Sequence, residues 1–123
     1  MIVYKQKKRI MEVLKTFDLE EIPNPHKISV RALHISDQAQ FEHLLLQAGE
    51  ELKLHITYST VYLYVLEGKG IVEAGDEQVV LEANMFVVIH PEVPHRLIND
   101  SESVFRVLNA KAPRPKKPTH LVS

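Results

Sequence analysis

The sequence predicts an all-β protein that folds as a single antiparallel sandwich or barrel. From Lys27 onward, short runs of alternating apolar and polar residues recur, and each run ends at a turn signal rich in Gly, Pro, Asn or Asp. Regular short strands with such punctuation are typical of all-β sandwiches and barrels. Helical patterns do not alternate with these runs, as a βαβ fold would require. The 123 residues, 45% of them hydrophobic, suffice for one domain with one core.

Residues 1–26 are expected to form an N-terminal arm, either helical or extended. Four apolar residues follow the i, i+3, i+4, i+7 spacing of an amphipathic helix, namely Ile10, Val13, Leu14 and Phe17. They predict a short helix over residues 5–17, although its basic first turn opposes the helix dipole. The prolines of the segment Ile22-Pro23-Asn24-Pro25 end it. Because so short a helix is marginal alone in water, we expect the stripe to pack on the barrel or on a second subunit.

Residues 27–110 are expected to form the barrel, and residues 111–123 a proline-rich basic tail. The tail contains Pro113, Pro115 and Pro118, interspersed with the basic residues Lys111, Arg114, Lys116 and Lys117. Proline donates no ladder hydrogen bond, so the tail cannot continue a central strand. We expect an extended or disordered end, with packing on a partner subunit as the alternative.

Two segments of the barrel carry histidines at regular spacings. The first contains Gly49, His55 and Gly68, and the second contains Asn84, His90, Pro91, Pro94, His95 and Asn99. This pattern resembles the two signature motifs of the cupin family, and the resemblance covers about half of the chain. It implies a single cupin barrel, the double-stranded β-helix or jelly-roll type, with a short N-terminal helical or extended arm.

The resemblance also implies where a metal ion would bind, and it exposes two departures from the family pattern. His55 and His95 occupy two of the four ligand positions. Thr57 stands where the family has a second histidine, and Val61 stands where it has a glutamate. Transition metals need three or four fixed donors, so two imidazoles leave most positions to water. Valine cannot ligate at all, and a neutral threonine hydroxyl is a poor substitute for imidazole.

Two further histidines could complete the set. His90 adds a third imidazole if its loop folds inward, and His43 could reach the cavity from the neighbouring strand. We therefore expect a degenerate site for one divalent transition metal (Zn, Mn, Fe or Ni), bound weakly or not at all. Its candidate ligands are His55, His95 and His90. No organic cofactor is expected.

The interior of the barrel is also a candidate binding site for a small molecule. Strand alternation places His55, Thr57, Ser59 and Val61 on one face, which points into the barrel in cupins. The candidate ligand-binding residues are His55, Thr57, Ser59, His95 and Asn99. The alternative is a polar interior in which the two histidines hydrogen-bond each other, water or Asn99 without any ligand.

Three functions are consistent with these residues. The first is a stand-alone small cupin that binds a small polar molecule beside a degenerate metal site. The second is a metal-dependent enzyme, dioxygenase- or isomerase-like, with His55 and His95 as core ligands. The third is a metal-free acid–base epimerase or lyase in which one of these histidines transfers protons. Whether the protein is an enzyme stays open, because cupins carry many unrelated chemistries.

Composition excludes several other classes. Cysteine is absent, so disulfides and thiolate metal sites are excluded. The net charge of −1 gives no electrostatic drive toward nucleic acid. No apolar run approaches the ~20 residues of a membrane span, and the N-terminus lacks the apolar segment of a signal peptide. We expect a cytoplasmic protein with no nucleic-acid or membrane partner. Related small cupins are commonly dimers, which implies a homodimer.

Overall fold

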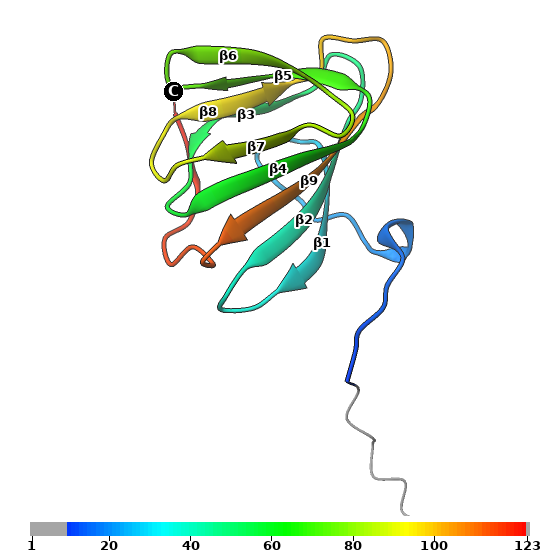
Figure 1. The fold of residues 1–123 in the computed structure, drawn as a ribbon. Helices are drawn as coiled ribbons and strands as arrows, with labels where there is room; N and C mark the ends of the chain where they lie inside the picture. Colours follow the sequence, from blue (N-terminus) through cyan, green and yellow to red (C-terminus); the bar gives the residue numbers. More distant parts are fainter. Residues whose placement is uncertain (1–9, 123) are drawn as a thin grey trace, which may run out of the picture.

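The computed structural model describes residues 10–122, and strands dominate it (Figure 1). In chain order they are β1 (Ser29–Ile35), β2 (Gln40–Leu46), β3 (Glu51–Ile56), β4 (Thr60–Glu67), β5 (Lys69–Ala74), β6 (Glu77–Glu82), β7 (Phe86–Ile89), β8 (His95–Ile98), β9 (Phe105–Ala112) and β10 (His120–Leu121). They pair antiparallel in two five-stranded sheets, ordered β1-β2-β9-β4-β7 and β10-β3-β8-β5-β6. The predicted all-β fold is confirmed. No helix within these residues is long and apolar enough to cross a membrane.

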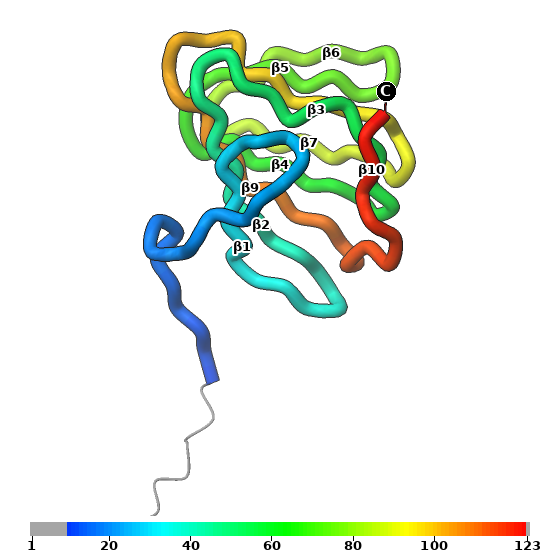
Figure 2. The backbone as a smooth tube through the Cα atoms, turned by 180° about the vertical axis from the view of Figure 1, so that it is seen from behind, coloured from blue at the N-terminus to red at the C-terminus, as the bar shows by residue number. Residues whose placement is uncertain are grey.

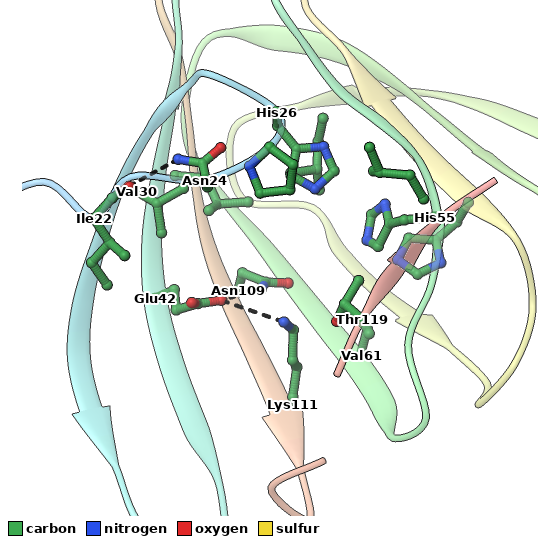
Figure 3. A pocket seen from close by; sticks show the side chains of 15 residues that line it. Ile22, Asn24, His26, Val30, Glu42, His55, Val61, Asn109, Lys111 and Thr119 are labelled. Carbon is green, nitrogen blue, oxygen red and sulfur yellow. Dashed lines mark hydrogen bonds and ion pairs between the residues drawn. The ribbon is translucent and has the colours of Figure 1, made fainter. Parts of the chain in front are cut away.

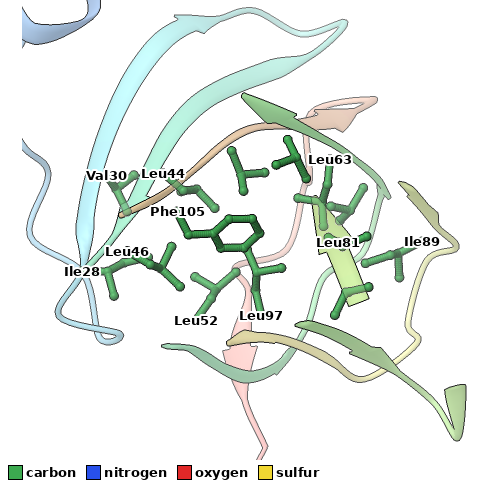
Figure 4. Packing of buried hydrophobic residues seen from close by; sticks show 14 residues of the cluster. Ile28, Val30, Leu44, Leu46, Leu52, Leu63, Leu81, Ile89, Leu97 and Phe105 are labelled. Carbon is green, nitrogen blue, oxygen red and sulfur yellow. The ribbon is translucent and has the colours of Figure 1, made fainter. Parts of the chain in front are cut away.

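The core lies between the inner faces of the two sheets. Strand β4 shows the alternation that builds it, with Val61, Leu63 and Val65 buried and the intervening residues half-buried. The fully buried ring of Phe105 lies in the middle of the cluster (Figure 4), and its burial stabilises the fold by roughly 1.5–3 kcal/mol. Gly70 is required beside it, because a Cβ there would collide with the Phe105 ring.

The arm does not form the predicted helix in its described part. Residues 10–15 are irregular, and a single 3₁₀ turn, η1 (Thr16–Asp18), follows them without a side-chain cap. Ile10 and Val13 are 97% and 77% exposed, so the stripe does not pack on the barrel as a unit. The helix prediction was wrong here because spacing alone supplies no burial, and a short uncapped helix needs burial to persist. Residues 5–9 of that prediction lie outside the described residues.

Phe17 ties the arm to the outer face of the first sheet. Its ring meets His43 edge-on, with centroids 5.3 Å apart. The guanidinium groups of Arg31 and Arg106 lie 5.2 and 5.3 Å from the ring centroid, within cation–π range. Arg31 Nε also donates a hydrogen bond to the Leu19 carbonyl at 3.0 Å. Phe17 and Leu19 are therefore two points at which the arm is held on the barrel, and the Ile22 amide adds a third by donating to the Val30 carbonyl at 2.7 Å.

His43 lies under this anchor and not in the barrel cavity, so the expectation that it could reach the cavity was wrong. It is almost fully buried, and its Nε2 accepts a hydrogen bond from Arg106 Nε at 3.0 Å. Its neighbours Glu42 and Leu44 line the cavity inside the barrel. Alternation along β2 therefore turns His43 to the outside.

The tail folds back onto the second sheet (Figure 2). Strand β10 pairs with β3, so that His120 lies opposite Ile56 and Leu121 opposite His55. The Val122 amide donates to the Leu54 carbonyl at 2.9 Å. We expected an extended or disordered end, and the described tail is extended but ordered as an edge strand. The prolines lie in the connection before it, where no ladder donor is needed.

The buried state of His43 predicts an acid-dependent loss of stability. Burial, followed by the charges of Arg106 and Arg31, lowers the pKa of His43 from 6.5 to about 4. The unfolded chain therefore binds this proton near pH 6.5, and the folded chain only near pH 4. The His43 contribution to the free energy of unfolding is full above pH 6.5 and falls as the pH drops toward 4. Between pH 7 and pH 5, the wild type should lose about 2 kcal/mol of its free energy of unfolding through His43, and His43→Gln should not show this loss.

Urea unfolding at the two pH values measures this difference. His34→Gln is the matched control, because it removes an exposed imidazole from β1 and keeps the buried His43, so the loss caused by His43 should remain. If His43→Gln loses as much stability as the wild type over this range, His43 is not held neutral in the folded protein.

Candidate functional site

The site begins at a break in the pairing of β3 with β8. Leu52 pairs with Leu97, and His55 pairs with His95. Two residues of β3, Lys53 and Leu54, therefore lie opposite only one residue of β8. Such a β-bulge releases backbone groups from the ladder. It also brings His55 and His95 directly opposite each other. Both are buried, at 4% and 3% exposure, and their ring centroids lie 4.2 Å apart.

Backbone carbonyls fix the tautomer of both rings. Nδ1 of His55 donates to the Lys53 carbonyl at 2.6 Å, and Nδ1 of His95 donates to the Val93 carbonyl at 2.8 Å. Because a carbonyl oxygen can only accept, each Nδ1 carries the proton and each Nε2 carries a lone pair. Burial, and then the charge of His95, lowers the pKa of His55 to about 3. Burial likewise lowers the pKa of His95, so both rings are neutral near pH 7.

The two lone pairs open into a cavity. Among the described residues, the fully buried side-chain atoms without a partner are His43 Nδ1 and Thr57 Oγ1. The Nε2 atoms of His55 and His95 are not among these fully buried atoms, and both residues line the cavity. Two acceptors cannot hydrogen-bond each other. The alternative in which the two histidines bond to each other is therefore wrong, and both nitrogens are open to a donor from the cavity.

His26 is a third imidazole at the cavity, and no pattern in the sequence predicts it there (Figure 3). Its ring centroid lies 5.1 Å from that of His55. Its Nδ1 accepts the Lys53 amide proton at 2.8 Å, so the ring proton is on Nε2. The backbone of Lys53 thus gives His26 and His55 opposite tautomers. Burial, and then the charges of Lys53 and Lys111, lowers the pKa of His26 to about 4.

A charged pair forms the wall across from the histidines. Lys111 and Glu42 have side chains only 15% and 14% exposed, and Lys111 Nζ lies 3.8 Å from Glu42 Oε1, beyond hydrogen-bond length. Asn109 Nδ2 donates to the same oxygen at 3.1 Å, and Gln40 Nε2 donates to Oε2 at 3.2 Å. The carboxylate is therefore held by two amides, while the ammonium keeps its hydrogen-bonding capacity for the cavity (Figure 3).

The cavity has a volume of about 200 Å³. Its remaining lining comes from the arm and the tail, through Ile22, Asn24, Pro25, Thr119 and Leu121, and from the apolar side chains of Val30, Leu44, Leu52 and Val61. This volume is below the ~300 Å³ at which drug-sized sites begin. The cavity therefore suits a molecule of only a few carbon atoms, and both ends of the chain form part of its wall.

Several predicted site residues do not line this cavity. The Ser59 hydroxyl donates to the Pro113 carbonyl. Asn99 Nδ2 donates to the carbonyls of Leu46 and Ser103 at 2.9 and 2.8 Å, which holds the turn after β8. His90 is exposed in the connection from β7 to β8. The predicted alternation from His55 to Val61 holds, because His55, Thr57, Ser59 and Val61 are all buried, but Thr57 and Ser59 do not line the cavity.

The donor set does not fit the resident metal site that the cupin resemblance implies. Val61 faces the cavity without a donor atom, and Thr57 is buried away from it. The free nitrogen of His26 is protonated, and His90 lies outside. Within residues 10–122, no group of three or more His, Asp or Glu side chains is arranged to hold a metal ion. Two imidazole nitrogens remain where zinc sites use three or four protein ligands.

The cupin domain family (Cupin_2) matches residues 42–111. Among solved structures, TT1209 from Thermus thermophilus is 28% identical, with a TM-score of 0.73, over 85% of this chain and 100% of that one. The polyketide cyclase RemF from Streptomyces resistomycificus has a TM-score of 0.80 at 17% identity, over 93% of this chain and 87% of that one.

A third similar structure is an RmlC-like cupin family protein with a double-stranded β-helix fold from Methanocaldococcus jannaschii. It is 22% identical, with a TM-score of 0.72, over 88% of this chain and 95% of that one. At identities this low, the likeness to it and to RemF concerns the fold alone. No curated protein matches the chain. The family match spans most of the barrel, and with the two-sheet architecture it shows that this chain belongs to the cupin family.

Proposed function

We propose that this cupin binds a small polar molecule in the cavity between the histidines and Lys111. The observation that carries the proposal is the pair of neutral imidazoles whose Nε2 lone pairs face the cavity with no protein donor. A ligand that donates hydrogen bonds to His55 and His95 would satisfy both acceptors, with a net gain of about 0.5–1.5 kcal/mol for each hydrogen bond.

The rest of the cavity supports the same function. Apolar side chains such as Leu52 and Val61 surround a few convergent polar groups, which is the usual composition of a small-molecule site. Acid–base catalysis by the histidines has less support. A pKa of about 3 leaves His55 without a proton to donate near pH 7 and makes it a weak base.

A weakly held divalent metal is the second candidate, and one observation favours it. Metal-ligating histidines commonly donate their other ring N–H to a backbone carbonyl, as His55 and His95 do. With two imidazoles and no further protein ligand, such an ion would exchange readily. The proposed binding of a small molecule does not depend on it.

Removing the His95 acceptor should weaken binding of a small hydroxylated molecule. We expect at least one of glycerol, glycerate and serinol to bind the EDTA-treated protein and to shift the ring resonances of His55 and His95 in NMR titrations. His95→Phe keeps a ring of similar size but loses the acceptor, and it should lower the affinity about tenfold, the effect of one hydrogen bond of ~1.4 kcal/mol.

His90→Phe is the control, because His90 is exposed and away from the cavity. It should bind each compound as the wild type does. The proposed function fails if none of the three compounds perturbs the cavity histidines, or if His95→Phe binds them with undiminished affinity.

A third ligand introduced at Val61 should create a stronger metal site. Val61 lines the same cavity as both histidines, so Val61→Glu adds a carboxylate at the position where the family has its glutamate. Zn²⁺, Mn²⁺ or Ni²⁺ should bind this variant more than tenfold tighter than the wild type, a difference above ~1.4 kcal/mol, by isothermal titration calorimetry. A histidine at position 57 would not add a ligand in the same way, because Thr57 is fully buried and a larger ring would overpack its surroundings.

Val61→Gln provides the matched comparison, since it has the same size and no charge. Equal metal affinities for the two Val61 variants would show that the histidine nitrogens are not placed to share an ion with position 61. A wild type that already binds as tightly as Val61→Glu would instead restore the metal-dependent enzyme hypothesis.

A further inference from the structure

We propose that the molecule bound in the cavity is a small polyhydroxy carboxylate, with its hydroxyl groups donating to His55 and His95 and its carboxylate accepting from Lys111. The inference rests on the proposed function and names the chemical class of its ligand. It follows from the positions of hydrogen-bond donors and acceptors on the cavity wall.

The histidine side of the cavity requires donors from the ligand. His55 Nε2 and His95 Nε2 are both acceptors, because their Nδ1 protons are held by backbone carbonyls. A single hydroxyl group carries one proton and can satisfy only one of them. Two hydroxyl groups on one small molecule satisfy both. Hydroxyl groups also accept, which suits the remaining donor of this wall, the Nε2–H of His26.

The opposite side requires an acceptor, preferably an anion. Lys111 Nζ carries three protons, and its contact with Glu42 is an ion pair at 3.8 Å without a hydrogen bond. The Glu42 oxygens already accept from Asn109 and Gln40. A ligand carboxylate would give Lys111 a short charge-assisted hydrogen bond, about twice as strong as one between neutral groups.

The electrostatics of the cavity favour an anion over a cation. Burial is the main cause that lowers the pKa of His26, His55 and His95, and the positive charge of Lys111 lowers each of them further. Glu42 opposes this effect only at His26. The field around His55 and His95 therefore disfavours an added positive charge. This field would destabilise a ligand ammonium group and stabilise a ligand carboxylate.

Four molecules of similar size separate these requirements. Glycerate carries two hydroxyl groups and a carboxylate, glycerol has hydroxyl groups alone, propionate has a carboxylate alone, and serinol replaces the carboxylate with an ammonium group. In calorimetric titrations of the full chain after EDTA treatment, glycerate should bind at least tenfold tighter than each of the other three.

Variants of the charged wall assign the carboxylate preference to Lys111. Lys111→Arg should keep the preference for glycerate over glycerol, because the charge remains. The double variant Glu42→Gln with Lys111→Met removes both charges and avoids leaving a buried carboxylate unpaired. It should bring the glycerate and glycerol affinities within about threefold of each other, a difference under ~0.7 kcal/mol.

The outcomes separate this inference from the proposed function. If glycerol, propionate or serinol binds in the cavity as tightly as glycerate, the ligand class is wrong although the cavity still binds small molecules. If the double variant retains the full preference, Lys111 does not recognise the carboxylate. If none of the four compounds shifts the cavity histidines, both the ligand class and the proposed function fail. Should the double variant not fold, the wild-type comparison of the four compounds already decides the question.

Discussion

The peptide of Lys53 is the structural element on which the site depends. In a regular ladder its N–H and C=O would be candidates for pairing with β8, but the bulge between Leu52 and His55 leaves them free. The N–H then binds His26 and the C=O binds His55. One irregular residue thereby makes one ring a donor and the other an acceptor at its free nitrogen. The hydrogen-bonding character of the cavity follows from this break in the sheet and not from the histidines alone.

The ends of the chain complete the cavity that the barrel begins. The arm contributes the loop with Asn24 and His26, and the tail contributes Thr119 and Leu121 through an added edge strand. Outside the barrel, Phe17 anchors the arm on His43 and two arginines. These segments add to the wall of a small cavity, where hydrogen bonds are stronger than in bulk water because part of the surroundings is apolar.

The sequence predicts the barrel well, because alternation and turn residues act locally. It also places His55 and His95, through the resemblance to the cupin motifs. It does not find His26, since a loop histidine has no periodic signal and its partner Lys53 lies 27 residues away. It places Ser59 on the buried face correctly, but it does not find that the hydroxyl donates to the Pro113 carbonyl, because that partner lies 54 residues away. It predicts a helix from the apolar stripe of the arm, which gains little burial. Helical spacing without a packing partner is therefore insufficient to form a stable helix.

The tautomeric state of the three cavity histidines in the EDTA-treated protein directly tests whether the cavity presents two acceptors and one donor. Long-range ¹H–¹⁵N correlation spectra near pH 7 report which nitrogen of each ring carries the proton. The hydrogen bonds of the site predict protonated Nδ1 with free Nε2 for His55 and His95, and protonated Nε2 for His26. A protonated Nε2 on either His55 or His95, or a protonated Nδ1 on His26, would contradict this prediction, because the cavity would then lack the pair of acceptors that a ligand must satisfy.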